Sequence, residues 1–245
     1  SGRRVEVAYQ PIVDGSRGSI VAVEALARAT HPDDGPIDPS LLVHEAKRLG
    51  LLDELTDQVL ERSLADMARF QALAPGLRDL HVNLDLGQLA QGPMGELLPR
   101  LAAAHPHVRL TVEMTEDSVH GAGEDVLARL EEVRASGIRL ALDDFGQGYS
   151  TMLAVVEVPF DILKVDRSLL AGITTSGRSV QVMRSLVRLS RTLHLDMVVE
   201  GVELAEERDV LLRLGVRQMQ GFWYSRPESA EVLCERFAAR GLTVA

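Results

Sequence analysis

The chain has 245 residues, of which 46% are hydrophobic, and a formal net charge of -10. This length suits one barrel-sized domain with a single core, so we expect residues 1–245 to form one domain. The acidic balance disfavours a protein that binds DNA or RNA duplexes broadly. Cys234 is the only cysteine, which excludes an internal disulfide and a thiolate zinc cage.

The sequence has no visible targeting or membrane-spanning segment. No apolar run approaches the roughly 18 residues of a transmembrane helix, and the chain starts without a signal-peptide pattern. We therefore expect no membrane contact from this segment and a reducing, cytoplasmic location. A strand-like run begins almost at once, at Val5. The domain is therefore expected to be part of a longer protein, which can be membrane-associated elsewhere.

Apolar strand-like runs alternate with helical patterns along the chain. Leu60, Leu64 and Met67 illustrate the helical spacing, because they form one apolar face between two strand-like runs. Gly137 and Gly215 each follow a helical pattern and precede a strand, as glycines at helix C-termini do. The predicted strands cover residues 5–13, 20–27, 80–84, 108–113, 138–143, 160–166, 197–200 and 216–220.

About eight strands in strand–helix order predict an α/β fold, a TIM-like (β/α)8 barrel. The first two strands are an exception to this order. They are separated only by residues 14–18, Asp-Gly-Ser-Arg-Gly, which is a hairpin signal. We therefore expect one strand of the barrel to be antiparallel to its neighbours.

Polar side chains end many of the apolar runs. In a strand, alternate residues face opposite sides, so Val112 should face the covering helices and Glu113 the barrel interior. The carboxyl ends of barrel strands form the active-site face in enzymes of this fold. The polar residues that should converge there are Asn83, Glu113, Asp143, Lys164, Asp166, Glu200 and Gln220.

Asp143 and Asp144 are adjacent carboxylates at the end of a strand, and they precede a Gly-x-Gly turn. Such a pair is costly unless cations stabilise it, which favours a metal site over a solvated charge pair. Carboxylate and amide oxygens select a hard divalent cation such as Mg²⁺ or Mn²⁺. His81 also has inward parity, but it lies deeper than Asn83, so we expect it in an interior layer of the barrel.

A series of motifs in this order resembles the EAL-domain family, and it covers nearly the whole chain. A lone Glu-Ala-Leu would mean little, whereas the ordered set with compatible spacing is specific. The motifs are Tyr9-Gln10-Pro11-Ile12, Glu24-Ala25-Leu26, His81-Val82-Asn83-Leu84, Glu113-Met114-Thr115-Glu116, residues 143–150, Lys164-Val165-Asp166-Arg167-Ser168, Glu200-Gly201-Val202-Glu203 and Gln220-Gly221.

The resemblance implies a barrel with one reversed strand that hydrolyses cyclic di-GMP to the linear dinucleotide 5'-pGpG, with two Mg²⁺ or Mn²⁺ ions per site. It assigns Lys164 to the attacking water and Glu200 as a base. The other implied roles follow. Glu24, Asn83, Glu113 and Asp143 would bind a first metal, and Asp144 and Glu200 would lie around a second. Arg28, Gln220 and Asp166 would contact the substrate, while Glu116 and Glu203 would support the loops.

The resemblance also implies a homodimer, through the face near residues 143–150, and attached sensor or regulatory domains. Two alternatives to an active phosphodiesterase stay open. One is a weak or inactive EAL domain that binds cyclic di-GMP as a receptor, since Gln147 departs from the family pattern in the loop that carries Asp144. The other is a protein-interaction module that has lost the ligand.

Overall fold

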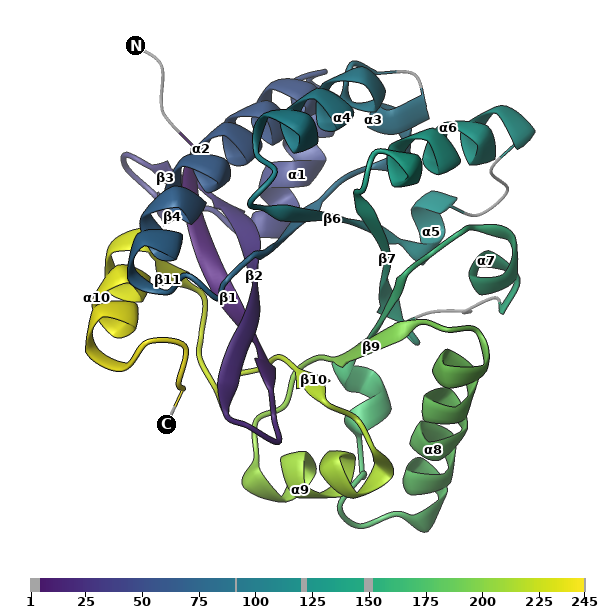
Figure 1. Ribbon diagram of the computed structural model, residues 1–245. Helices are drawn as coiled ribbons and strands as arrows, with labels where there is room; N and C mark the ends of the chain where they lie inside the picture. The colour runs from purple at the N-terminus through teal and green to yellow at the C-terminus, as the bar shows by residue number, and fades with distance from the viewer. Residues whose placement is uncertain (1–4, 91, 120–122, 148–151, 245) are drawn as a thin grey trace.

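The structure is a computed structural model that describes residues 5–90, 92–119, 123–147 and 152–244, apart from a few side chains of which Glu116 is one. Eight strands of this described part close into a barrel with helices around it (Figure 1). In chain order they are β1 (Glu6–Asp14), β2 (Ser19–Arg28), β5 (Asp79–Asn83), β6 (Arg109–Thr115), β7 (Arg139–Phe145), β8 (Ile162–Val165), β9 (Asp196–Val199) and β10 (Gln218–Met219).

The first strand, β1, runs against its neighbours. It pairs antiparallel with β2 on one side and with β10 on the other, and the remaining neighbours around the ring pair parallel. The hairpin between β1 and β2 closes through Gly18 N, which donates to Asp14 O at 2.8 Å. The predicted barrel with one reversed strand is therefore confirmed. A short strand, β11 (Glu228–Ser229), adds to β1 from outside.

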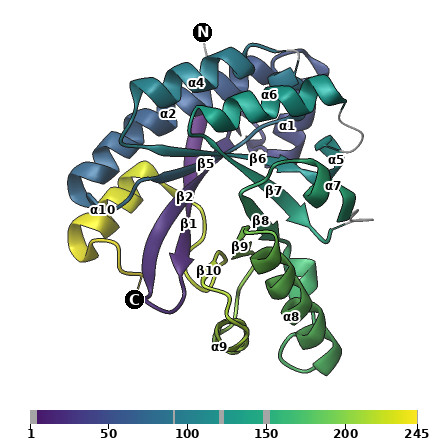
Figure 2. The same cartoon turned by 45° about the vertical axis from the view of Figure 1, so that its right-hand side comes forward.

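Helices cover the outside of the barrel (Figure 2). None of those in the described residues has the length and apolar character that crossing a membrane requires. Two short strands, β3 (Thr30–His31) and β4 (Gly35–Pro36), pair antiparallel and form a small separate hairpin. The helices are α1 (Pro39–Arg48), α2 (Leu52–Leu73), α3 (Leu86–Ala90), α4 (Met94–Ala104), α5 (Glu116–Val119), α6 (Glu124–Ala135), α7 (Met152–Glu157), α8 (Gly177–Thr192), α9 (Ala205–Leu214) and α10 (Ala230–Arg240), with a 3-10 turn, η1 (Arg167–Leu170).

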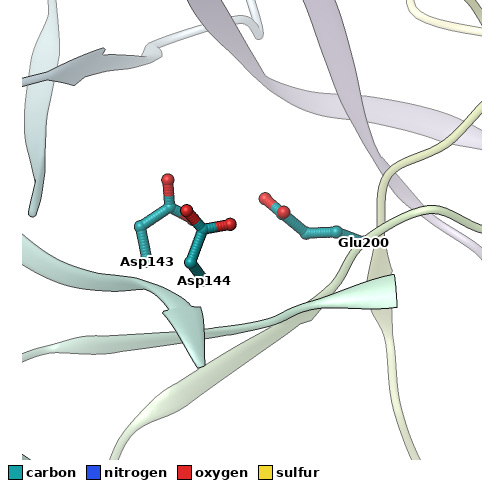
Figure 3. Close-up of side chains that lie close together, drawn as sticks. All are labelled: Asp143, Asp144 and Glu200. Atoms are coloured by element: carbon teal, nitrogen blue, oxygen red, sulfur yellow. The ribbon is translucent and has the colours of Figure 1, made fainter. Parts of the chain in front are cut away.

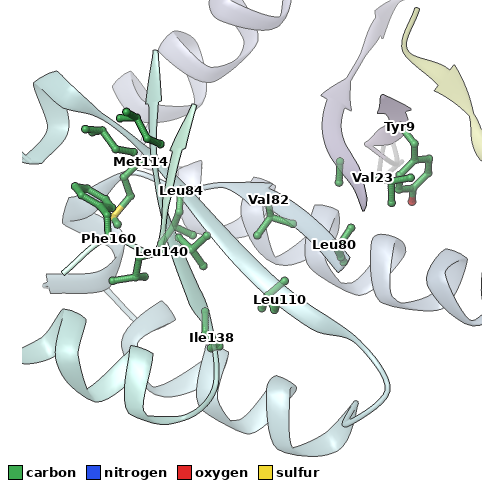
Figure 4. Packing of buried hydrophobic residues seen from close by; sticks show 14 of the residues in the cluster. Tyr9, Val23, Leu80, Val82, Leu84, Leu110, Met114, Ile138, Leu140 and Phe160 are labelled. Carbon is green, nitrogen blue, oxygen red and sulfur yellow. The ribbon is translucent and has the colours of Figure 1, made fainter. Parts of the chain in front are cut away.

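The main core lies between the barrel and its helices, where strand residues such as Leu110 and Leu140 meet the helices (Figure 4). Edge-to-face contact between Tyr9 of β1 and Phe70 of α2, with ring centroids 5.1 Å apart, extends this layer. A second, smaller cluster lies inside the barrel, and we call it the inner plug. It consists of Ile12, Ala22, Ala141, Ile162 and Val198.

The alternation along β6 and β7 matches the predicted parity. Leu140 and Leu142 pack in the outer core, while Ala141 between them belongs to the inner plug. Glu113 pairs in register with Ala141, and Asn83 pairs with Glu113. The interior is therefore apolar where the parallel strands begin, and it becomes polar toward their carboxyl ends.

Candidate active site

Lys164 of β8 lies at the centre of the polar end of the barrel. Its side chain is only 1% exposed, and four carboxylates surround its ammonium group. Burial alone would lower the pKa of Lys164, but the four carboxylates raise it well above its usual value, so the side chain is positively charged. From Nζ the distances are 2.7 Å to Glu113 Oε2, 2.7 Å to Glu200 Oε1, 3.1 Å to Asp143 Oδ1 and 3.4 Å to Glu24 Oε2.

Glu24 of β2 is bound by two amides. Asn83 Nδ2 donates to Glu24 Oε1 at 2.9 Å, and Gln220 Nε2 donates to Glu24 Oε2 at 2.8 Å. Burial raises the pKa of Glu24, but Lys164 and these two amides outweigh burial and lower it to about 2. Glu24 is therefore ionised, and the carbonyl oxygen of Asn83 stays available as a ligand because its amide NH₂ faces Glu24.

Asp143, Asp144 and Glu200 converge on one point at the end of the barrel (Figure 3). One oxygen of each lies within 4.8 Å of the others. Burial, with the negative charges of Asp143 and Asp166, raises the pKa of Asp144 to about 6. Burial also raises the pKa of Glu200, to about 8, against the ammonium of Lys164. The three carboxylates are thus close together despite mutual repulsion, as expected of groups that share a cation.

The irregular end of β7 and the turn that follows it impose this geometry on the backbone. Asp144 has a φ of 57°, a left-handed conformation that is uncommon for a residue with a side chain. Gly146 follows with a φ of 104°, and a Cβ there would lie 2.4 Å from Leu169 Cδ1. Gln147 N donates to Asp144 O at 3.1 Å, while the Gln147 side chain is exposed. Gln147, which differs from the family pattern, therefore contacts this turn through its backbone N–H, a donor that every residue except proline has.

These groups line one cavity of about 760 Å³ at the carboxyl end of the barrel. Its floor is the acidic cluster around Lys164, and its walls include residues of α1, α2 and the segment after β10. Of the residues predicted from the sequence, the cavity brings together Glu24, Arg28, Asn83, Glu113, Asp143, Asp144, Lys164, Glu200, Glu203 and Gln220.

The family model of the EAL domain matches residues 1–227 of this chain. The chain belongs to the EAL-domain family. It is 34% identical over 224 residues to the cyclic di-GMP phosphodiesterase RocR of Pseudomonas aeruginosa, covering 91% of this chain and 57% of RocR. It is 31% identical over 233 residues to the bifunctional diguanylate cyclase/cyclic di-GMP phosphodiesterase MucR of the same organism, covering 94% of this chain and 34% of MucR. The chain thus spans about a third to just over half of these relatives.

Solved EAL structures have the same fold. A complex of the MucR phosphodiesterase with c-di-GMP superposes with a TM-score of 0.84 at 31% identity, covering 94% of both chains. A manganese and cy-diGMP complex of Klebsiella pneumoniae BlrP1 superposes with a TM-score of 0.75 at 31% identity, covering 94% of this chain and 57% of that one. The EAL fold of this chain is therefore established.

Several predicted residues lie elsewhere, or outside the described part. Asp166 caps η1, where its Oδ1 accepts from Ser168 N at 2.8 Å, and it is not among the residues that line the cavity. Its predicted substrate contact stays a prediction. The side chain of Glu116 and residues 148–150 of the predicted dimer face lie outside the described residues, so their roles also stay predictions.

Gln10 and Arg167 also line the cavity, although the sequence did not assign them a role there. Gln10 is the register partner of Glu24 across the antiparallel β1–β2 pair. Its position two residues before Ile12, which belongs to the inner plug, could have identified it as an inward-facing residue.

The donor set fits hard divalent cations. Five carboxylates share the site with one lysine, so the site carries an excess of negative charge. Among the described residues, Gln220 Oε1 is a buried acceptor without a hydrogen-bond donor, and Asp143 Oδ1 has only the ion pair with Lys164 Nζ at 3.1 Å. Buried acceptors of this kind are costly unless a ligand or an ion satisfies them. Oxygen ligands without thiolate or imidazole are the set that Mg²⁺ and Mn²⁺ prefer.

Proposed function

We propose that this EAL domain hydrolyses cyclic di-GMP to linear 5'-pGpG with two divalent cations, Mg²⁺ or Mn²⁺. The observation that carries the proposal is the buried Lys164 among four carboxylates, in the same cavity as the Asp143, Asp144 and Glu200 cluster. Relatives named as cyclic di-GMP phosphodiesterases support the choice of substrate.

The residues that hold the cations would be the oxygen donors at the cavity floor. When bound, such cations would lower the pKa of a water molecule and neutralise the charge that develops on the phosphate. One set of ligands consists of Glu24, Asn83, Glu113 and Asp143, and Asp144 and Glu200 complete the second.

The cavity is suited to a dinucleotide. Its volume of about 760 Å³ falls in the range of sites for drug-sized ligands. Arg28 is partly buried at the cavity wall, where its guanidinium can bind phosphate oxygens by paired hydrogen bonds. Val43, Leu52 and Leu55 form an apolar wall against which a base can pack. The cavity therefore offers separate surfaces for charged and for apolar parts of the substrate.

The product defines the bond that breaks. Because 5'-pGpG keeps its 5'-phosphate, water attacks phosphorus and the bond from phosphorus to the 3'-oxygen breaks. Lys164 Nζ orients the attacking water by donating a hydrogen bond. Glu200 Oε1 accepts from Lys164, which leaves Glu200 Oε2 to take the proton of the water. A raised pKa suits Glu200 to this role, since a base works best near the working pH.

The second candidate is a receptor that binds cyclic di-GMP without cleaving it. It rested on Gln147, whose side chain is exposed and does not line the cavity. A receptor needs no lysine among four carboxylates, because that arrangement serves bond cleavage more than affinity. The geometry therefore favours the enzyme.

The test is a turnover assay with matched variants. Purified protein is incubated with cyclic di-GMP and Mg²⁺ or Mn²⁺, and pGpG is followed by chromatography. We expect product from the wild type and from the control Glu132→Gln, an exposed member of an ion pair on α6, but not from Lys164→Ala or Glu24→Gln. Binding without product under both metals would favour the receptor. Protein that binds no cyclic di-GMP would be an interaction module.

We further propose that the domain acts as a homodimer in the cytoplasm, joined to sensor or regulatory domains in a longer chain. The relatives support the last point, because the matched segment is 34% of MucR and 57% of RocR. Light scattering of the purified chain tests the dimer, and a monomer at all concentrations would contradict it.

A further inference from the structure

His81 contacts the site from below. It lies on β5, is 3% exposed, and its Nδ1 atom lies 2.7 Å from Glu113 Oε1. Lys164 Nζ binds the other oxygen, Glu113 Oε2, at 2.7 Å. Both oxygens of this buried carboxylate are therefore fixed, one by His81 and the other by the lysine.

The strand register explains why this contact forms. Asn83 pairs with Glu113 across β5 and β6, and His81 pairs with Thr111. Since His81 precedes Asn83 by two residues, it faces the interior one layer deeper. Its contact with Glu113 thus runs diagonally between the two strands, within reach of a long side chain. His81 stands between the inner plug and the acidic cluster.

The chemistry of the two groups decides which of them donates the hydrogen bond. Burial and the neighbouring carboxylates raise the pKa of Glu113 well above its usual value, but a carboxylate that binds a cation is ionised and can only accept hydrogen bonds. With a cation bound, Nδ1 of His81 would therefore carry the proton and donate it to Glu113 Oε1, 2.7 Å away. An imidazole with a single N–H is a neutral donor. A neutral donor orients a carboxylate without adding positive charge beside a cation site. A lysine or arginine in the same place would compete with the cation.

We infer that His81 is a positioning residue of the metal centre, which fixes Glu113 through Oε1 so that Oε2 faces the site. The inference rests on the proposed function only in taking Glu113 as a cation ligand. Hydrogen-bonded partners of metal ligands orient them, and their loss lowers metal affinity or activity by about 10–100-fold. His81 takes no direct part in the reaction, because it touches Glu113 and not the reacting atoms.

The test measures metal binding in the absence of nucleotide. Mn²⁺ is titrated into metal-free protein, and free Mn²⁺ is followed by electron paramagnetic resonance. We expect His81→Leu, which fills the space without a donor, to weaken Mn²⁺ binding by about 10–100-fold. His81→Asn should keep most of the affinity, since its amide nitrogen can donate from a place close to Nδ1.

The matched control is Thr111→Val, in the neighbouring position of the same layer. Thr111 is fully buried, and its hydroxyl has no hydrogen-bond partner among the described residues, so this nearly isosteric change should leave Mn²⁺ affinity unaltered. Thermal unfolding of each metal-free variant by circular dichroism establishes that it is folded. Equal losses in His81→Leu, His81→Asn and Thr111→Val would overturn the inference, because the layer would then matter only for packing.

A second measurement needs no variant of His81. Nitrogen-15 NMR of the wild-type imidazole in the Mg²⁺-loaded protein should report a proton on Nδ1, whereas an Nδ1 without a proton would overturn the inference. Wild-type protein that binds no Mn²⁺ would overturn the inference together with the metal assignment. Mn²⁺ binding without hydrolysis would contradict the proposed reaction alone and leave the role of His81 standing.

Discussion

The two ends of the barrel differ in how their charged side chains are paired. At the lower end, where the parallel strands begin, acidic side chains have arginine partners. Arg109 Nη2 lies 2.6 Å from Asp79 Oδ2, at the first residues of β6 and β5. Arg139 Nη2 lies 2.5 Å from Asp196 Oδ2, at the first residues of β7 and β9. The inner plug fills the interior just above with apolar side chains.

At the upper end, four carboxylates surround one lysine, and a fifth, that of Asp144, lies beside them on a residue with a left-handed backbone. Burial and like charges raise the pKa of Asp144 and of Glu200, so their ionised forms destabilise the metal-free fold. The lower end therefore stabilises the barrel, whereas the upper end loses stability by holding together the carboxylates of the proposed cation site. Such a division between stability and activity is common in enzymes.

The largest expected effect is on the inner plug. Ile162→Ala removes a side chain that is 1% exposed, and it should lower the free energy of unfolding by about 2–5 kcal/mol. The milder Ile162→Val should cost about 0.5–1.5 kcal/mol. Urea denaturation at neutral pH measures both. Mn²⁺ affinity per folded molecule should not change, and a large loss of affinity would contradict the separation of the two ends.

The next effect is a gain of stability at the upper end. Glu200→Gln keeps the shape of the side chain and removes its charge, so hydrolysis should be lost. The pKa of Glu200 is raised to about 8 in the folded state. Its contribution to stability is therefore complete at pH values below its ordinary pKa, and it is lost as the pH rises through about 8. The metal-free variant should therefore be more stable than wild type at pH 8, by about 0.5–2 kcal/mol.

The pH dependence separates this explanation from a general effect of the substitution. In the presence of a chelator, the difference in unfolding free energy between Glu200→Gln and wild type should grow from pH 5 to pH 8. A variant that is less stable than wild type at pH 8 would mean that the ion pair of Glu200 with Lys164, at 2.7 Å, outweighs burial and repulsion.

Much of this contrast could be predicted from the sequence, because strand parity is a local property. The alternation around Glu113 and Asp143 assigned them to the interior, and the structure brings both into the cavity. The hairpin at residues 14–18 likewise predicted the reversed strand, since turn chemistry is local.

The diagonal contact between His81 and Glu113 could not be predicted in the same way. It depends on the stagger of β5 against β6, which links residues 32 positions apart. The left-handed φ of Asp144 is also invisible in the sequence, because Asp is not a residue that requires this conformation. Asp166 shares the parity of Lys164, yet it caps η1, since the strand ends at Val165.

A smaller effect is expected at the lower hairpin. Asp14 Oδ1 accepts from Ser16 N at 2.9 Å, from Ser16 Oγ at 2.5 Å and from Arg17 N at 3.2 Å. Burial opposes ionisation, but the bonds from Ser16 outweigh it and lower the pKa of Asp14. A carboxyl group whose pKa is lowered in the folded state stabilises the fold at pH values above its ordinary pKa. This stabilisation is lost as the pH falls through the lowered pKa.

Asp14→Ala should therefore cost about 1 kcal/mol of unfolding free energy at pH 7, and the cost should shrink as the pH falls below 4. This direction is opposite to that of Glu200, whose metal-free form gains stability in acid. Urea denaturation at several pH values measures the free energy of unfolding. Ser16→Ala removes only the hydrogen bond from the Ser16 hydroxyl, so it should cost less than Asp14→Ala. A cost that is equal at pH 7 and pH 3 would contradict the assignment to the ionised carboxylate.

The smallest effect concerns the ion pairs of the lower end. Arg139 and Asp196 have side chains that are 29% and 54% exposed, so their pair should contribute only about 0–1 kcal/mol. A double-mutant cycle with Arg139→Gln and Asp196→Asn measures the coupling, which should vanish in about 1 M salt. A coupling well above this range would mean that attraction stabilises the lower end. A small coupling means that the lower end owes its stability to the buried apolar side chains of the inner plug more than to attraction between its exposed charges.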